Sequence, residues 1–244
     1  MTALREVVHE TRHAIEAIRR ACTSQLAPYH VEDRLYGCGV EGCVYKAGAH
    51  AAKISLNEEE ARAARWVQGL GRGRPPALPE IHDVRTLKCG GLSTYLILRE
   101  DLDDLRASDP RLVNKALTAV ETATAFSLTA FGPVERARAA GALRLLGSYI
   151  GIARRDAWIV KQLRTFTVWS VERGVAWLDL HTQNLGVRAG EKQVVIRDFG
   201  HSDIPDAPKD IPLVGRRGRR RGLARMVIGQ RGFVARALTG FGVT

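Results

Sequence analysis

Three polar side chains in the last third of the sequence have the types and the spacing that phosphoryl transfer requires. Asp179 and Asn184 fit the pattern Asp-x-x-x-x-Asn, and Asp198 follows Asp179 by nineteen residues, at the start of an Asp-Phe-Gly triplet. In this chemistry one aspartate accepts or orients the proton of the attacking hydroxyl, while an asparagine and a second aspartate bind magnesium against the phosphates of ATP. We therefore predict that Asp179 is catalytic and that Asn184 and Asp198 are metal ligands.

A second set of residues, nearer the N-terminus, could bind the phosphates of a nucleotide. Gly37, Gly39, Gly42 and Val44 fit the pattern Gly-x-Gly-x-x-Gly-x-Val. In dinucleotide sites such glycines open a helix, whereas β-branched and aromatic residues follow them here, so a hairpin is expected. A hairpin with little side-chain bulk can lie over a triphosphate and offer backbone N–H groups to it. An ordinary glycine turn is the alternative interpretation.

Lys53 is the predicted cation of this ATP-binding set, and it also acts in catalysis. It lies in the strand-like segment Ala-Ala-Lys-Ile, whose small apolar residues suit an ammonium group directed toward the α- and β-phosphates. A lysine that extends from a strand edge into solvent is the alternative. The following helix should supply a carboxylate partner, for which Glu58, Glu59 and Glu60 all qualify by spacing. Glu60 is favoured because it lies deepest in that helix.

The elements that must position these residues divide into a strand-rich part and a helix-rich part. Apolar spacing predicts a helix over residues 2–22, and five short strands with one helix between residues 35 and 98. Asn57 is the expected N-cap of that helix. Residues 102–174 have a helical pattern, and two strands flank a turn within 184–197. The predicted fold class is α+β and two-lobed, with a helical extension (1–30), a small antiparallel-sheet lobe (31–100), a mostly helical, abbreviated lobe (101–214) and a basic tail (215–244).

Composition narrows the classes of protein to which the chain can belong. The sequence has 244 residues, of which 45% are hydrophobic, so it can form a substantial core. It contains neither an apolar run long enough to span a membrane nor the core of a signal peptide, so we expect a cytoplasmic protein without a membrane partner. None of the four cysteines shows Cys-x-x-Cys spacing, which favours reduced thiols over a zinc site or a disulfide framework.

The formal net charge of +11 is concentrated toward the C-terminus. The segment Arg216–Arg221 contains five arginines. Such a run could neutralise the phosphates of a nucleic acid, or it could be a solvated tail that contacts an acidic protein surface. Few aromatic residues accompany it, so base stacking is poorly supported.

Together, these motifs resemble the protein-kinase-like superfamily over about residues 35–200. A closer likeness is to the early serine/threonine protein kinase of autographiviruses, which are podophages. It is carried by residues 73–84, by Asp179-Leu180-His181 with Asn184, and by the basic segment behind the kinase domain. The resemblance implies a kinase that uses Mg-ATP to phosphorylate host proteins on serine or threonine in the host cytoplasm.

Departures from the kinase pattern keep two other functions open. Trp177-Leu178 stands where a His-Arg pair usually precedes the catalytic aspartate, so regulation through a phosphorylated activation loop is not expected. His181 replaces a common lysine, and the 46 residues after Asp198 are too few for a full peptide-docking lobe. A small-molecule kinase of the aminoglycoside-phosphotransferase type is one alternative, and its acidic groove would use Asp101, Asp103 and Asp104. A nucleotide-binding pseudokinase with a polyanion-binding tail is the other.

Overall fold

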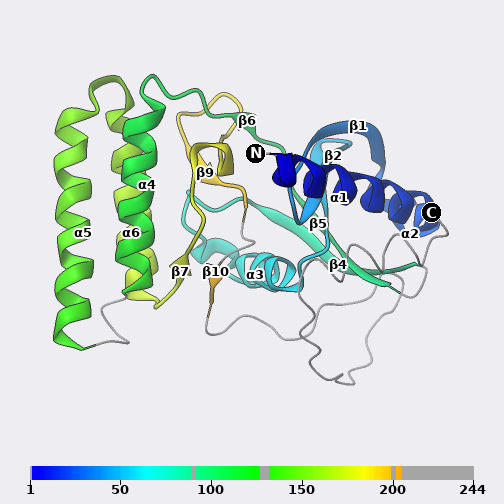
Figure 1. Cartoon of the computed structure of the whole chain (residues 1–244), viewed down its shortest axis with the longest axis horizontal. Helices are drawn as coiled ribbons and strands as arrows, with labels where there is room; N and C mark the ends of the chain where they lie inside the picture. Colours follow the sequence, from blue (N-terminus) through cyan, green and yellow to red (C-terminus); the bar gives the residue numbers. More distant parts are fainter. Residues whose placement is uncertain (1, 90–91, 127–131, 199–201, 205–244) are drawn as a thin grey trace. The chain divides into compact units, whose positions relative to one another are not determined.

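The chain divides into two compact units, each of which contains both helices and strands. A computed structural model describes residues 2–89, 92–126, 132–198 and 202–204 (Figure 1). The first unit comprises the chain up to Gln68 together with Ile81–Glu100, and the second comprises Gly69–Glu80 with the described part of Asp101–Ala207. The predicted α+β class is confirmed. Phe199 and Gly200 of the triplet, and the Arg216–Arg221 run, lie outside the described residues.

An antiparallel sheet of five strands forms the centre of the first unit, as the sequence predicts. The strands follow the order β1-β2-β3-β5-β4, so β3 is central and β1 and β4 are the edges. Every neighbouring pair is antiparallel. Their bounds are β1 (Val31–Cys38), β2 (Gly42–Ala47), β3 (His50–Ser55), β4 (Ile81–Cys89) and β5 (Leu92–Glu100).

The central strand β3 is buried on both faces, because helices cover both sides of the sheet. Successive side chains of a strand point to opposite faces. Ala52 and Ile54 share one apolar cluster with Ile15 and Ile18 of α1 (Thr2–Ala21), which shows that α1 packs on this face. The short helix α2 (Thr23–Leu26) follows α1. The alternate residues of β3 face the other helix, α3 (Glu58–Gly69), and Lys53 is one of them.

The first turn of α3 begins where the sequence predicts. Asn57 Oδ1 accepts hydrogen bonds from the backbone N–H groups of Glu59, at 2.8 Å, and of Glu60, at 3.3 Å. These donors have no partner within the helix, so the side chain satisfies groups that would otherwise need water. The cap fixes the residue at which the helix starts, and therefore which glutamate faces β3.

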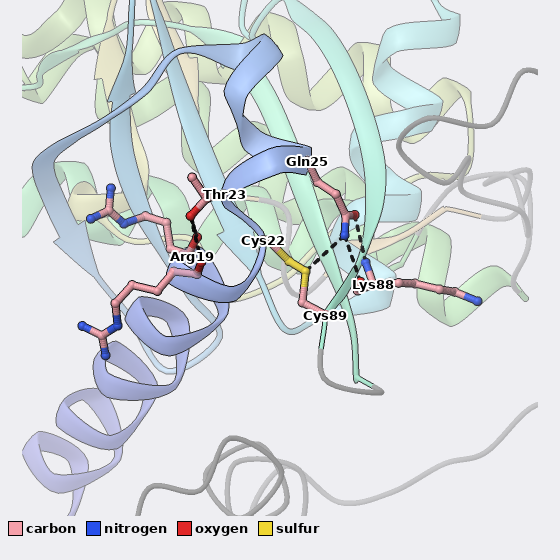
Figure 2. Close-up of a disulfide and its surroundings, with 7 residues drawn as sticks. Arg19, Cys22, Thr23, Gln25, Lys88 and Cys89 are labelled. Atoms are coloured by element: carbon pink, nitrogen blue, oxygen red, sulfur yellow. Dashed lines mark hydrogen bonds between the residues drawn. A yellow bond between two sulfur atoms is a disulfide. The ribbon is translucent and has the colours of Figure 1, made fainter.

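The expectation of free thiols is wrong, because all four cysteines are paired. Cys22, directly after α1, is bonded to Cys89 at the end of β4, with a Cα–Cα distance of 5.7 Å (Figure 2). Gln25 Nε2 donates to the carbonyl oxygen of Lys88 beside this bridge, at 2.9 Å. Cys38 is bonded to Cys43 across the β1–β2 hairpin. The Cys-x-x-Cys criterion missed both, since the packing of α1 on the sheet brings Cys22 to Cys89 and the pairing of β1 with β2 brings Cys38 to Cys43.

Three long helices dominate the second unit and lie side by side in Figure 1. They are α4 (Pro110–Ala125), α5 (Pro133–Ile152) and α6 (Ala157–Glu172). Five short strands accompany them. β6 (Asp103–Asp104), β8 (Leu185–Val187) and β9 (Val194–Ile196) form one sheet with β8 in the middle, and β7 (Ala176–Trp177) pairs with β10 (Ser202–Asp203).

Two features of the second unit were not expected from the sequence, namely the segment Gly69–Glu80 and the buried Trp177. Gly69–Glu80, expected in the small lobe, belongs to this unit, where the backbone N–H of Ile196 donates to the carbonyl oxygen of Ala77 at 2.8 Å. Trp177 is 1% exposed and its indole N–H donates to Ser170 Oγ at 2.9 Å, which fixes β7 against α6. Within the described ranges, no helix has the length and apolar character needed to cross a bilayer.

Candidate functional site

The predicted site residues fall into two sets, one in each unit, beginning with the glycine hairpin of the first unit. Gly37 pairs with Val44 across β1 and β2, and the backbone N–H of Gly39 donates to the carbonyl oxygen of Gly42 at 2.9 Å. A Cβ on Gly42 would lie 2.4 Å from the carbonyl oxygen of Ile54, so only glycine fits there. A Cβ on Gly37 or Gly39 would meet nothing within 4 Å. Close packing against β3 therefore explains why residue 42 is a glycine. It does not explain Gly37 and Gly39, which have open space beside the backbone.

Hydrogen bonds from two directions fix the tip of this hairpin. The backbone N–H of Leu56, after β3, donates to the carbonyl oxygen of Glu41 at 2.7 Å. From α1, the buried Thr11 Oγ1 donates to the carbonyl oxygen of Val40 at 3.1 Å. These bonds use carbonyl oxygens at the tip, and they hold the loop in place without occupying the space beside Gly37 and Gly39.

Lys53 and Glu60 form a buried ion pair. The Lys53 Nζ lies 2.5 Å from Glu60 Oε1, and the two side chains are 8% and 1% exposed. Ser55, two residues further along the same face of β3, donates from Oγ to Glu60 Oε2 at 2.6 Å. Both carboxylate oxygens are thus bonded, which lowers the free-energy cost of burying the charge. The favoured choice of Glu60 agrees with this geometry.

The other two glutamates in the first turn of α3 have different surroundings. Glu59 is exposed. Glu58 accepts a hydrogen bond from the phenol of Tyr95 on β5, and the pKa of Tyr95 is raised above its ordinary value, chiefly by burial and then by the charge and hydrogen bond of Glu58. The first turn of α3 is therefore attached to the sheet through two acids, of which only Glu60 pairs with a lysine.

In the second unit, Asp179 has an unusual backbone conformation. Its φ angle is +57°, in the left-handed region that residues other than glycine seldom occupy, although aspartate and asparagine tolerate it better than most. The residue is exposed, and its carboxylate forms no hydrogen bond or ion pair with any other described residue. Non-glycine residues in such conformations cluster at functional sites, because the surrounding structure must hold them there.

Side chains of α4 supply part of that support. The Glu121 carboxylate accepts a hydrogen bond from the backbone N–H of Leu180 at 2.5 Å, and Asn114 Oδ1 accepts one from Thr182 at 3.0 Å. The side chain of Asn184 closes the loop by donating from Nδ2 to the carbonyl oxygen of Asp179 at 2.9 Å. The backbone is therefore fixed at Asp179 and in the residues that follow it.

The predicted metal ligands Asn184 and Asp198 lie at one end of the β8–β9 ladder. Leu185 pairs with Ile196, and beyond this pair the backbone N–H of Arg197 donates to the carbonyl oxygen of Asn184 at 2.9 Å. The amide oxygen of Asn184 has no hydrogen-bond partner among the described residues, so it could bind a cation. Oxygen ligands from an amide and one carboxylate, completed by phosphate and water, fit magnesium.

A site composed entirely of protein ligands is absent from the described ranges, where no group of three or more His, Cys, Asp or Glu side chains is arranged to hold a metal ion. Magnesium usually keeps several waters and binds through one or two carboxylates together with substrate phosphates, so it does not require such a group.

Sequence reasoning missed three supporting residues. Ser55 had a visible signal, because it lies two residues after Lys53 on the same face of a predicted strand. Glu121 and Asn114 had none, since they lie more than 50 residues before the loop that they support, within a helical stretch of uniform composition. A search against protein-family models finds no match, and a search of curated proteins also finds none. The chemistry assigned to these residues accordingly depends on their types and geometry.

Proposed function

We propose that the chain is a Mg-ATP-dependent phosphotransferase of the two-lobed, protein-kinase-like kind, which transfers the γ-phosphate to serine or threonine hydroxyls of proteins. The observation that carries this proposal is the buried Lys53–Glu60 pair behind an open glycine hairpin. Burying an ion pair rarely adds stability over an apolar pair of similar size, so its presence calls for a functional reason. An ammonium held in a fixed position for phosphate oxygens is such a reason.

Each residue of the two sets has a distinct task in the proposed reaction. The hairpin would lie over the phosphates, which the open space beside Gly37 and Gly39 permits, and Lys53, held by Glu60, would neutralise the phosphate charge. Magnesium supplies further charge neutralisation when it is bound by Asn184, Asp198 and phosphate. The carboxylate of Asp179 would orient the acceptor hydroxyl and take its proton as the new P–O bond forms and the bond from the γ-phosphorus to the β–γ bridging oxygen breaks, which releases ADP.

The experiment that tests this function is transfer of label from γ-labelled ATP by the purified chain, with a bacterial lysate as the source of protein acceptors. The wild type should label serine or threonine residues, whereas D179N should not. Mass spectrometry of the labelled proteins would identify candidate substrates. Binding of ATP without any transfer would instead favour a pseudokinase.

A small-molecule acceptor is the second candidate, and one observation favours it. Asp103 and Asp104 are exposed on β6, which pairs with β8 directly after the Asp179 loop. Arg197 neutralises Asp104 at 2.9 Å, so Asp103 is the acid of this strand more open to a cationic substrate. Labelling of an aminoglycoside or a choline-like amine, lost in D103N, would establish this function, and labelling of protein alone would exclude it.

A further inference from the structure

Two histidines on the exposed side of α1 face each other and have no part in the proposed reaction. His9 and His13 are four residues apart, so they lie one above the other on the helix surface. Their Nε2 atoms are 2.9 Å apart, and the ring centroids are 4.3 Å apart with planes nearly perpendicular. Both side chains are exposed, so an ion could reach them from solvent.

The distance between the two nitrogens is at the short end of the range that a shared metal ion would require. Zinc binds imidazole nitrogen at about 2.0–2.1 Å, so two such ligands lie about 2.9–3.4 Å apart for angles of about 90–110° at the metal. In the absence of an ion, one ring donates its Nε2 proton to the other. For both nitrogens to bind a metal, the donor ring needs to carry that proton on Nδ1, and both rings need to turn so that their Nε2 lone pairs point at the ion.

The residues between the two histidines reinforce this interpretation. The segment His9-Glu10-Thr11-Arg12-His13 fits the pattern His-Glu-x-x-His, in which one helix face presents two histidines to zinc. Zinc peptidases need a third protein ligand as well. No such three-residue group is present in the described part of the chain, so the arrangement points to metal binding and not to peptide hydrolysis.

We propose that His9 and His13 form a two-histidine site for a divalent transition-metal ion such as Zn²⁺, with water completing the coordination. Thr11, between them in the sequence, faces inward and donates to Val40 at the tip of the glycine hairpin. An ion that bridges His9 and His13 would therefore stabilise the turn of α1 that supports this tip. The site is independent of the proposed phosphotransfer.

Titration calorimetry with zinc chloride tests the site, using the full chain without nucleotide and without reductant, so that the cysteines stay paired. The wild type should bind one ion, and H9A and H13A should each weaken the affinity by about tenfold or more, because one ligand of a chelate is lost. His30→Asn is the matched control, since it removes an exposed imidazole and asparagine tolerates the positive φ of 52° at that position. This variant should bind zinc like the wild type.

Two further measurements separate this site from other zinc ligands. D198A should retain the ion if the histidines hold it, and it should lose the ion if zinc occupies the predicted magnesium position. Nitrogen-15 spectra of the imidazoles should show zinc-dependent shifts at Nε2 of His9 and His13. An H9A/H13A double variant that still binds one zinc ion with wild-type affinity would overturn the proposal.

Discussion

The Lys53–Glu60 pair and the Asp179 loop differ in how the protein holds a charged group. Lys53 and Glu60 are enclosed by the sheet and α3, and the two side chains bond to each other and to Ser55. Asp179 is exposed, and its position is fixed through the backbone of its neighbours, from Glu121 and Asn184. In one region burial positions the charge, and in the other a constrained backbone does.

This difference bears on what each region can do. A buried ammonium with a fixed partner suits a task that stays the same throughout a reaction, such as binding phosphate. A carboxylate that must take up a proton and release it again needs access to the substrate and to water. The contrast predicts that substitutions in the Lys53–Glu60 pair mainly lower the free energy of unfolding. Substitutions in the Asp179 loop should mainly lower the rate of phosphate transfer.

The largest effect is expected for D179N, on activity. The asparagine cannot take the proton of the acceptor hydroxyl, so the rate of transfer should fall by about 10²–10⁴-fold. Because asparagine tolerates positive φ and the residue is exposed, the free energy of unfolding should change by no more than about 0.5 kcal/mol. Transfer assays and urea unfolding check the two parts. A large loss of stability would contradict the comparison, because it would give the Asp179 side chain a role in folding.

The second largest effect is expected for E60A, on stability. The variant removes the carboxylate that pairs with the buried Lys53 ammonium, which should lower the free energy of unfolding by about 3–5 kcal/mol. E59A is the matched control, since Glu59 is the exposed neighbour on the same turn, and it should change the value by no more than about 0.5 kcal/mol.

A double variant sharpens this result. K53M/E60L removes both charges and should recover most of the stability lost in E60A, because an apolar pair replaces the ion pair. It should still fail to transfer phosphate. Recovery of activity together with stability would show that the pair has no role in the reaction.

A smaller effect is expected for E121A. The variant leaves the backbone N–H of Leu180 without its acceptor, which should destabilise the present conformation of the Asp179 loop by about 1–3 kcal/mol. Because that conformation would be less populated, kcat should fall. KM for ATP should be unchanged, because Glu121 positions the Asp179 loop and not the hairpin. E121Q is the matched control, since it retains an acceptor oxygen at the same place. A change of KM alone would contradict this role.

The smallest effect concerns Tyr95 at alkaline pH. Burial and the neighbouring Glu58 raise the pKa of its phenol in the folded state. The contribution of Tyr95 to stability is therefore complete below its ordinary pKa of 10.0, and it is lost as the pH rises toward the higher value of the folded state. Unfolding curves between about pH 9 and 11 should show this decline in the wild type and a weaker one in Y95F. E58Q should lie between the two.

Local signals in the sequence were sufficient to predict the strands and the helix α3 of the first unit. The glycines, the alternation along β3 and the cap at Asn57 each specify structure within a few residues, whereas spacing left Glu58, Glu59 and Glu60 as alternatives for the partner of Lys53 and Glu60 was favoured only for its depth in the helix. The antiparallel β8–β9 pair around Asn184 and Arg197 followed from the same kind of signal.

The features that sequence reasoning missed depend on contacts between distant segments. Cys22 and Cys89 are 67 residues apart, and only the packing of α1 on the sheet brings them together. The support of Leu180 by Glu121 spans 59 residues, and helical periodicity says nothing about it. His9 and His13 are a different case, because their spacing of four residues can be read in the sequence, whereas the helix there was predicted from its apolar residues alone.

The bridge between Cys38 and Cys43 makes a small covalent ring of the hairpin tip. It joins residues that face each other on β1 and β2, with a Cα–Cα distance of 4.1 Å, and encloses residues 39–42. The two strands therefore cannot separate at the tip while the disulfide bond is intact. The tip has fewer conformations open to it before any ligand arrives, so less conformational entropy would be lost if it ordered against one.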